Sequence, residues 1–151
     1  MLRVVKAWTT HGKPMEKPIV LVVEDEALIR ISALHMIRDA GFEVLEACNA
    51  DEAIKQLESR SDIRAVFTDV RMPGSIDGWK LAGAVRGRWP PIHLIVASAL
   101  FPDGELPSNG VFIPKPYTAE QVTAALYELF NHDPASGPIM HDTGRNCARV
   151  A

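Results

Sequence analysis

Residues 19–26 read Ile19-Val20-Leu21-Val22-Val23-Glu24-Asp25-Glu26, an apolar and mostly β-branched run that gives way at once to three acids. A continuous apolar run of this length is typical of a strand that is buried on both faces, as strands are in a parallel sheet covered by helices. The following residues, 26–40, predict a helix that ends at Gly41 as its C-cap. The apolar side chains of this helix recur at helical spacing: Leu28, Ile31, Leu34 and Ile37.

The same alternation of strand and helix patterns continues along the chain. Strands are predicted over residues 42–46, 63–68, 92–97 and 110–113, and helices from a cap at Asn49 or Asp51, from residue 77 and over 118–130. Strands that alternate with helices indicate βαβ units, and therefore an α/β fold with a five-stranded parallel sheet. One connection differs, because residues 99–109 contain two prolines, one glycine and no apolar helical face. They predict a loop with at most one helical turn.

The ends of the chain differ from its middle. We expect a flexible extension over residues 1–17, a folded domain over 18–131 and a flexible tail over 132–151. The composition, 47% apolar and 23% charged with a net charge of −3, suits a globular domain and gives no basic field to attract nucleic acid or an anionic membrane. No apolar run reaches the roughly 18–20 residues of a membrane span. The two cysteines form no disulfide framework, so we expect a cytoplasmic protein with neither a nucleic-acid nor a membrane partner.

Polar side chains follow four of the predicted strands: Glu24 and Asp25 after the first, Asp69 after the third, Ser98 after the fourth and Lys115 after the fifth. In open parallel α/β sheets, ligands bind beyond these carboxyl ends. Crowded carboxylates repel one another unless a cation lies among them, and hard oxygen ligands suit Mg²⁺. Each residue alone has an ordinary explanation, such as an acidic helix start, a capping hydroxyl or a solvated lysine. All of these explanations would have to hold at once if the set had no shared function, and this argues against them.

The ordered set Glu24-Asp25, Asp69, Ser98-Ala99 and Lys115-Pro116 resembles bacterial response-regulator receiver domains over roughly residues 18–131. The stretches 23–26 and 69–74 are similar to the two acidic signatures of that family. The resemblance implies a flavodoxin-like (CheY-like) fold, which is a doubly wound five-stranded parallel sheet. The ending Lys115-Pro116-Tyr117 is similar to a subgroup in which the fourth helix is short or absent.

By this resemblance Asp69 is the phosphoacceptor, and the cofactor is Mg²⁺. Asp25, Asp69 and the backbone carbonyl of Arg71 would bind the metal, and Glu24 would act through a water or by adding charge. The metal would remove the repulsion between a carboxylate and a phosphoryl group and orient in-line attack.

The resemblance also assigns the residues that would bind the phosphoryl group. Lys115 would pair with a phosphoryl oxygen, and the Ser98 hydroxyl and the Ala99 N–H would bond the attached group. The peptide bond between Lys115 and Pro116 would be cis, as it usually is in the family.

Three features depart from the pattern of the family. Residues 74–76 make the loop before Asp77 one residue longer than usual, which would reshape the edge of the site. The Arg71 side chain either lies near the phosphoryl group and changes its lifetime, or is exposed with no role beyond its carbonyl. Residues 99–109 are too short and broken for the usual fourth helix, so phosphorylation would order or disorder this loop.

Phe112 corresponds to the switch aromatic of the family. Its ring either swings as Ser98 moves onto the phosphate or is a fixed core residue.

The expected function is that of a single-domain response regulator in a phosphorelay. It would accept a phosphoryl group from a histidine kinase or histidine phosphotransfer protein, assisting its own phosphorylation and dephosphorylation without being an enzyme. Because no output domain follows residue 131, it would signal through an unknown protein partner or serve as a phosphate sink. The alternative is a receiver-like interaction module that is never phosphorylated. An Mg²⁺-dependent phosphatase with an aspartate nucleophile is disfavoured, because Arg71 stands where such enzymes usually have a second aspartate.

Overall fold

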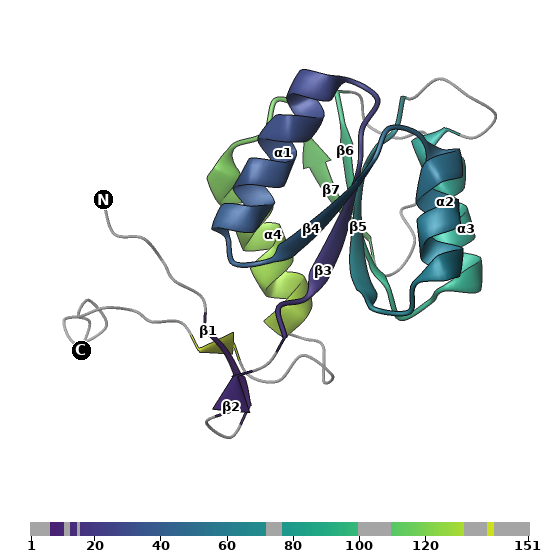
Figure 1. The fold of residues 1–151 in the computed structure, drawn as a ribbon. Helices are drawn as coiled ribbons and strands as arrows, with labels where there is room; N and C mark the ends of the chain where they lie inside the picture. The colour runs from purple at the N-terminus through teal and green to yellow at the C-terminus, as the bar shows by residue number, and fades with distance from the viewer. Residues whose placement is uncertain are drawn as a thin grey trace.

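The computed structural model describes residues 7–10, 13–14, 16–71, 77–99, 110–131 and 139–140. Its main body is a parallel five-stranded sheet in the order β4-β3-β5-β6-β7, with helices on both faces (Figure 1). The strands are β3 (Ile19–Val23), β4 (Glu43–Ala47), β5 (Ile63–Asp69), β6 (His93–Ser98) and β7 (Gly110–Pro114). The helices of the described residues are α1 (Ala27–Asp39), α2 (Ala50–Ser59), α3 (Gly78–Arg88) and α4 (Ala119–Asn131). The predicted α/β class and five parallel strands are confirmed.

Strands β3 and β5 are neighbours in the sheet although β4 lies between them in the sequence. The chain therefore leaves β3 in one direction and crosses back over it, so the strand order reverses between β3 and β5. In open α/β sheets the crevice outside the carboxyl ends at such a reversal is the usual place for a ligand. Glu24 and Asp25 follow β3 and Asp69 ends β5, so acids from two chain segments face this crevice.

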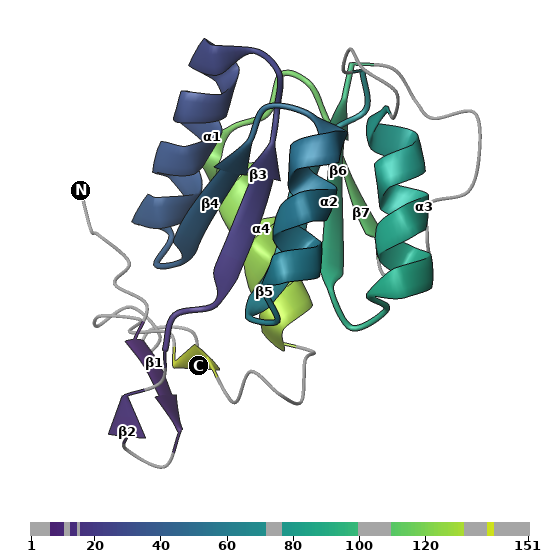
Figure 2. The ribbon, with the colours of Figure 1, turned by 45° about the vertical axis from the view of Figure 1, so that its right-hand side comes forward.

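Two apolar layers hold the helices on the sheet. Helices α1 and α4 lie on one face and α2 and α3 on the other (Figure 2). All five residues of β3 are buried. Val20 and Val22 point into the layer beneath α1 and α4, and Ile19, Leu21 and Val23 point into the layer beneath α2 and α3. This alternation explains why β3 is apolar at every position, since both of its faces are covered.

Local signals set the ends of the helices. Gly41 has φ 98°, a left-handed conformation that glycine adopts without steric cost, and it ends α1 as predicted. Asn49 rather than Asp51 caps α2, because its side-chain oxygen accepts a 2.8 Å hydrogen bond from the N–H of Glu52. Asp77 caps α3 in the same way, with a 2.8 Å bond from the N–H of Lys80.

The first turns of α1 depart from the expected apolar stripe. Leu34 and Ile37 are buried, but Leu28 is 81% exposed and Ile31 is 48% exposed. α1 runs back along the sheet from the carboxyl end of β3, so its first turn lies at the edge of the sheet. The start of the helix therefore presents an apolar surface among the described residues.

Three short strands form a separate antiparallel sheet in the order β2-β1-β8. They are β1 (Ala7–Thr10), β2 (Lys13–Pro14) and β8 (Ile139–Met140), and Trp8 pairs with Ile139. These strands lie within the segments 1–17 and 132–151, which the sequence predicts to be flexible, and the sequence gives no sign of their pairing. Pairs between segments so far apart in the sequence leave no local pattern, and strands of two to four residues are too short to show a period. The flexibility of the remaining tail residues stays a prediction.

Residues 72–76 and 100–109 lie outside the described residues. The longer loop over 74–76 and the short or missing fourth helix within 99–109 therefore remain predictions. In the part of the chain that the structure describes, no helix has both the length and the hydropathy needed to cross a membrane.

Candidate functional site

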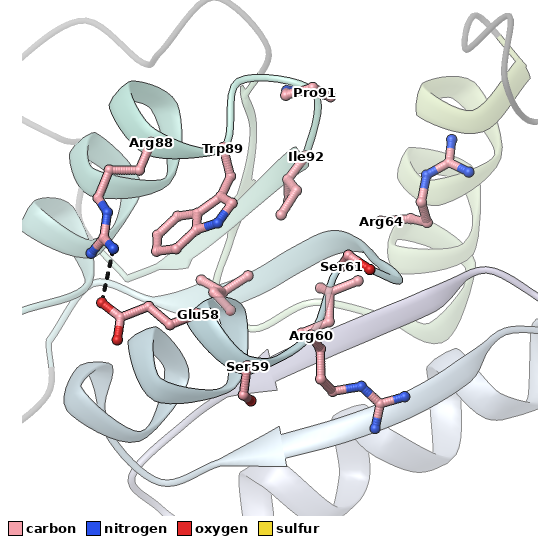
Figure 3. A pocket seen from close by; sticks show the side chains of 11 residues that line it. Glu58, Ser59, Arg60, Ser61, Arg64, Arg88, Trp89, Pro91 and Ile92 are labelled. Carbon is pink, nitrogen blue, oxygen red and sulfur yellow. Dashed lines mark hydrogen bonds and ion pairs between the residues drawn. The ribbon is translucent and has the colours of Figure 1, made fainter.

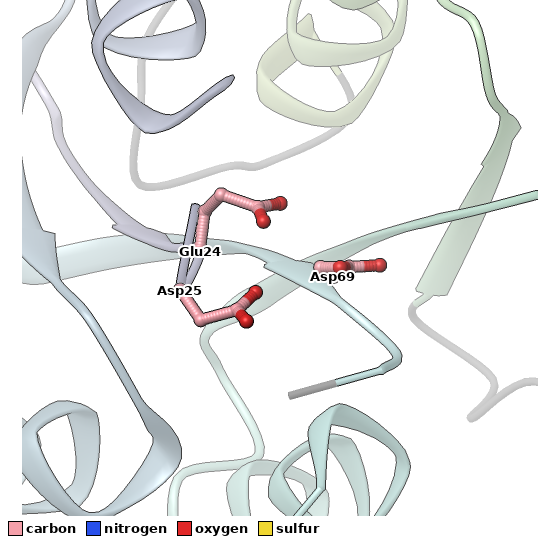
Figure 4. A group of neighbouring side chains, drawn as sticks. All are labelled: Glu24, Asp25 and Asp69. Carbon is pink, nitrogen blue, oxygen red and sulfur yellow. The ribbon is translucent and has the colours of Figure 1, made fainter. Parts of the chain in front are cut away.

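Three carboxylates come together where the strand order reverses (Figure 4). One oxygen of each of Glu24, Asp25 and Asp69 lies within 4.8 Å of the others. Glu24 and Asp69 are buried, with 4% and 9% of their surface exposed, whereas Asp25 is exposed. The structure thus brings together the acids that the sequence placed on two different strand ends.

Hydrogen bonds to main-chain groups hold the two strand ends that carry these acids. The N–H of Glu24 donates to the carbonyl of Ala47 at 3.1 Å, which extends the pairing of β3 with β4 by one residue. The N–H of Glu26 donates to Oε1 of Glu24 at 3.3 Å. On the other strand, the hydroxyl of Thr68 donates to the carbonyl of Asp69 at 2.9 Å. The carboxylates therefore stand on a main chain that is held on both strands.

Lys115 supplies a positive charge to the cluster. Its Nζ lies 3.2 Å from Oδ2 of Asp69 and 3.4 Å from Oε2 of Glu24, and the Lys115 side chain is 20% exposed. The Lys115–Pro116 peptide bond is cis, as expected. The N–H of Lys115 donates to the carbonyl of Ser98 at 2.9 Å, which ties the end of β7 to the end of β6. Lys115 therefore reaches Asp69 and Glu24 from the side of β5 on which β6 and β7 lie, opposite to β3.

The electrostatics of the cluster show that one ammonium does not balance the acids. Burial raises the pKa of Glu24, the negative charge of Asp69 raises it further, and the ammonium of Lys115 opposes both effects. Burial also raises the pKa of Tyr117 to about 12, and the charges of Glu24 and Asp69 add to this shift. Negative charge therefore exceeds positive charge in a partly buried space, which favours a further cation.

The donor set fits Mg²⁺. Magnesium–oxygen bonds of about 2.0–2.1 Å in octahedral geometry place ligand oxygens roughly 3–4 Å apart, so these carboxylates would need only small rotations. Mg²⁺ prefers oxygen ligands and is usually held by one or two carboxylates together with waters and phosphate oxygens. Asp25 and Asp69 would bind such an ion directly, and the buried Glu24 would add charge beside it.

Gly78 allows α3 to begin directly against the strand end that carries Asp69. A Cβ atom at this position would lie 1.7 Å from the carbonyl oxygen of Asp69 and 2.9 Å from the Cα of Val70. The N–H of Gly78 also donates to the carbonyl of Val70 at 2.9 Å. No side chain larger than hydrogen fits there without moving Asp69 or the helix.

The remaining predicted residues occupy the rim. Ser98, the last residue of β6, is buried, and the exposed Ala99 follows it. In the β5–β6 pair Asp69 aligns with Ala97, so Ser98 lies one residue beyond the level of Asp69. Arg71 is exposed, and its role as a carbonyl ligand stays a prediction. Phe112 is half-buried opposite Val96, so it is not a fully buried core residue.

An apolar groove of about 540 Å³ borders the site. It runs between α1 and the turn after β7, and it is lined by Leu28, Ile29, Ser32, Met36, Ala99, Lys115, Pro116 and Tyr117. Because Lys115 belongs both to this groove and to the acidic cluster, a partner lying in the groove would reach the edge of the site.

A second hollow of about 650 Å³ lies far from the acids, between the ends of α2 and α3 (Figure 3). Ile63, at the opposite end of β5 from Asp69, is part of its lining. Glu58 binds Arg88 across it at 2.8 Å, while the Arg60 and Arg64 side chains point away from Trp89 in different directions. The larger hollow therefore brings no set of convergent polar groups to one point.

Sequence reasoning missed the roles of Gly78 and Tyr117. In the sequence Gly78 belongs to the helix start predicted from residue 77, and its approach to the Asp69 carbonyl leaves no signal in the local pattern. Tyr117 was noted only for its place after Lys115-Pro116, and no pattern in the sequence indicated that its ring packs edge-on against Phe67 at 5.5 Å.

Comparisons with known proteins agree with this geometry. The model of one protein family, the response regulator receiver domain, matches residues 20–127. The chain is 31% identical over 116 residues to the sensor kinase CckA of Brucella abortus (strain 2308), a match that covers 73% of this chain and 12% of that protein. The chain thus spans about an eighth of the length of that relative.

Solved structures give the same picture. The crystal structure of a response regulator receiver protein from Sinorhizobium medicae WSM419 matches with a TM-score of 0.70 at 30% identity, covering 78% of this chain and 98% of that one. The response regulator TrrA from Thermotoga maritima, crystallised in complex with Mg²⁺–BeF, matches with a TM-score of 0.67 at 27% identity, covering 76% of this chain and 99% of that one.

Proposed function

The chain belongs to the response regulator receiver domain family, whose model matches residues 20–127, and from this we propose that it accepts a phosphoryl group on Asp69 in an Mg²⁺-dependent reaction. One observation carries the proposal. The Asp69 carboxylate lies 3.2 Å from the ammonium of Lys115 and within 4.8 Å of oxygens of Glu24 and Asp25. A nucleophilic carboxylate, a cation-binding acid pair and a lysine are thus within reach of one phosphoryl group.

The chemistry follows from these positions. A carboxylate oxygen of Asp69 attacks the phosphorus of a phosphohistidine, and the new O–P bond forms as the P–N bond breaks and the imidazole leaves. Mg²⁺ held by Asp25, Asp69 and the Arg71 carbonyl would neutralise charge between the two anionic reactants. The Lys115 ammonium is placed to exchange its contact with Asp69 for one with a phosphoryl oxygen.

Ser98 and Ala99 would bind the phosphoryl group once it is attached to Asp69. Ser98 is the last residue of β6, the strand next to β5, and Ala99 follows it. The Ser98 hydroxyl and the Ala99 N–H would donate hydrogen bonds to the attached phosphoryl group. Movement of Ser98 onto that group would leave space for the half-buried Phe112 to change position, with residues 99–109 responding. The Arg71 side chain would tune how long the aspartyl phosphate lasts before water hydrolyses it. No separate substrate is turned over, so the chain is not an enzyme in this proposal.

A protein phosphodonor suits the surface beside the site. Leu28 and Ile31 expose apolar side chains on α1, and the groove between α1 and Lys115 reaches the acidic cluster. Apolar side chains exposed beside a reactive site are typical of a surface that another protein covers. We expect the donor to be a histidine kinase or histidine phosphotransfer protein, and the output to pass to a protein partner or to end in a phosphate sink.

Intact mass spectrometry after incubation with a small phosphodonor and Mg²⁺ tests the proposal. We expect one phosphoryl adduct, which fails to form without Mg²⁺ and in Asp69→Asn. Asp62→Asn is the matched control, because it makes the same change at an exposed aspartate before β5. If no adduct forms and stopped-flow tryptophan fluorescence detects no short-lived one, the chain is instead a receiver-like interaction module that works without phosphorylation.

A further inference from the structure

Arg30 connects α1 to the chain segment that carries two of the acids. Its Nη1 donates a 2.9 Å hydrogen bond to the backbone carbonyl of Glu24, and its Nε lies 3.7 Å from Oε2 of Glu46 on β4. Only 18% of the Arg30 side chain is exposed. Arginine is rarely buried to this extent unless its guanidinium is paired, so these two contacts account for its place.

The carbonyl that Arg30 binds belongs to the peptide between Glu24 and Asp25. The N–H of Glu24 is already held by Ala47 on β4. With Arg30 in place, both backbone polar groups of Glu24 have partners, one on the sheet and one on α1. The plane of the Glu24–Asp25 peptide is thereby fixed, and this plane decides the directions in which the two carboxylates leave the main chain.

The positive charge of Arg30 acts on carboxylates other than those of the acidic cluster. The pKa of the Glu52 carboxyl is lowered chiefly by the backbone N–H of Cys48, and the charge of Arg30 contributes to the same shift. At Glu24, by contrast, the perturbing charges are those of Asp69 and Lys115. The guanidinium contacts the Glu24 main chain and Glu46 on β4, and neither contact is with a carboxylate of the acidic cluster, so its removal would mainly disturb the orientation of the acids.

We propose that Arg30 is a positioning residue, which binds the Glu24 carbonyl to α1 and so holds the Glu24 and Asp25 carboxylates in the arrangement that receives a divalent cation. This inference rests on the proposed function. Residues that orient metal ligands from outside commonly change metal affinity by about 10-fold to 100-fold when they are replaced.

The test is Mg²⁺ binding to the unphosphorylated protein, measured by isothermal titration calorimetry. We expect Arg30→Gln to weaken binding by about 10-fold or more. Arg30→Lys keeps a donor that can reach the carbonyl and should recover part of the affinity. Two controls should bind Mg²⁺ as the wild type does: Arg38→Gln, the same charge change in the exposed last turn of α1, and Glu46→Gln, which removes only the ion pair.

A second readout separates positioning from general stability. The amide nitrogen of Asp25 belongs to the same peptide as the bound carbonyl, so its NMR chemical shift should move in Arg30→Gln and stay in place in Arg38→Gln. If Arg30→Gln does not fold, Arg30→Met decides, because it keeps a long side chain but has no donor for the Glu24 carbonyl. Wild-type affinity with an unmoved Asp25 signal in the folded variant overturns the proposal. A wild-type protein that does not bind Mg²⁺ would instead overturn the proposed function.

Discussion

Replacing Gly78 with alanine should disturb the site through a single added carbon atom. The new Cβ would lie 1.7 Å from the carbonyl oxygen of Asp69 and 2.7 Å from its carbonyl carbon. Favourable contacts between heavy atoms begin at about 3.5 Å, so α3 and the end of β5 must separate by well over 1 Å. A separation of that size also breaks the 2.9 Å hydrogen bond from Gly78 to the carbonyl of Val70.

The cost follows from these distances. Overpacking of this kind costs about 1–3 kcal/mol. The lost hydrogen bond adds about 1 kcal/mol. Alanine returns about 0.4–1 kcal/mol by lowering the entropy of the unfolded chain. We expect a net loss of about 1–3.6 kcal/mol of unfolding free energy. We also expect a slowing of phosphorylation of up to about 100-fold, because displacements near 1 Å at a reacting group cost this much.

Urea denaturation and the rate of phosphorylation by a small phosphodonor, compared at equal folded fractions, measure the two effects. Gly83→Ala and Gly87→Ala are the matched controls, since a Cβ at either position of α3 would meet no atom within 4 Å. Both controls should gain up to about 1 kcal/mol and keep the wild-type phosphorylation rate. If Gly78→Ala matches the wild type in both stability and rate, the reasoning about close approach is wrong.

Two further predictions concern the charges of the site. Lys115→Ala should slow phosphorylation by about 100-fold to 1,000-fold, because the ammonium beside Asp69 would no longer stabilise the transferring group, whereas Lys80→Ala on the exposed face of α3 should not. Equal rates in the two variants would argue against that role. Because the pKa of Glu24 is raised in the folded state, its proton favours folding, and this stabilisation is lost as the pH rises through the folded pKa. Glu24→Gln should therefore melt above the wild type in Mg²⁺-free buffer near neutral pH, and the gap should close as the pH falls towards about 4.3. A gap that does not change with pH would contradict this.

The main sheet and the acidic cluster could be predicted from the sequence because both depend on local patterns. The run from Ile19 to Val23 is apolar at every position, since helices cover both faces of β3. The position at which each strand ends in turn determines which side chains lie at the carboxyl edge of the sheet. Glu24, Asp25 and Asp69 come together because parallel strands end at the same edge, so strand boundaries that were right to within a residue or two were sufficient.

The features that could not be predicted from the sequence depend on contacts that local patterns do not encode. The approach of Gly78 to Asp69 is a matter of backbone distance across a loop, and the bond from Arg30 to the Glu24 carbonyl depends on the rotamer of a long side chain. The pairing of β1 with β8 joins segments on either side of the main domain. The exposure of Leu28 shows the same limit, since helical spacing identifies an apolar face but not what covers it.

The hydrogen bond from the Lys115 N–H to the Ser98 carbonyl continues the β6–β7 ladder to the edge of the site. The Ser98 hydroxyl and the Lys115 ammonium therefore stand on two strand ends that a hydrogen bond joins, and not on two independent loops. We expect a displacement of Ser98 to move Lys115 through this bond, and with it the groove that Lys115 lines. In the proposed function, a phosphoryl group on Asp69 would therefore change the groove beside α1 as well as β7, and the phosphorylated domain would present an altered surface to its phosphodonor.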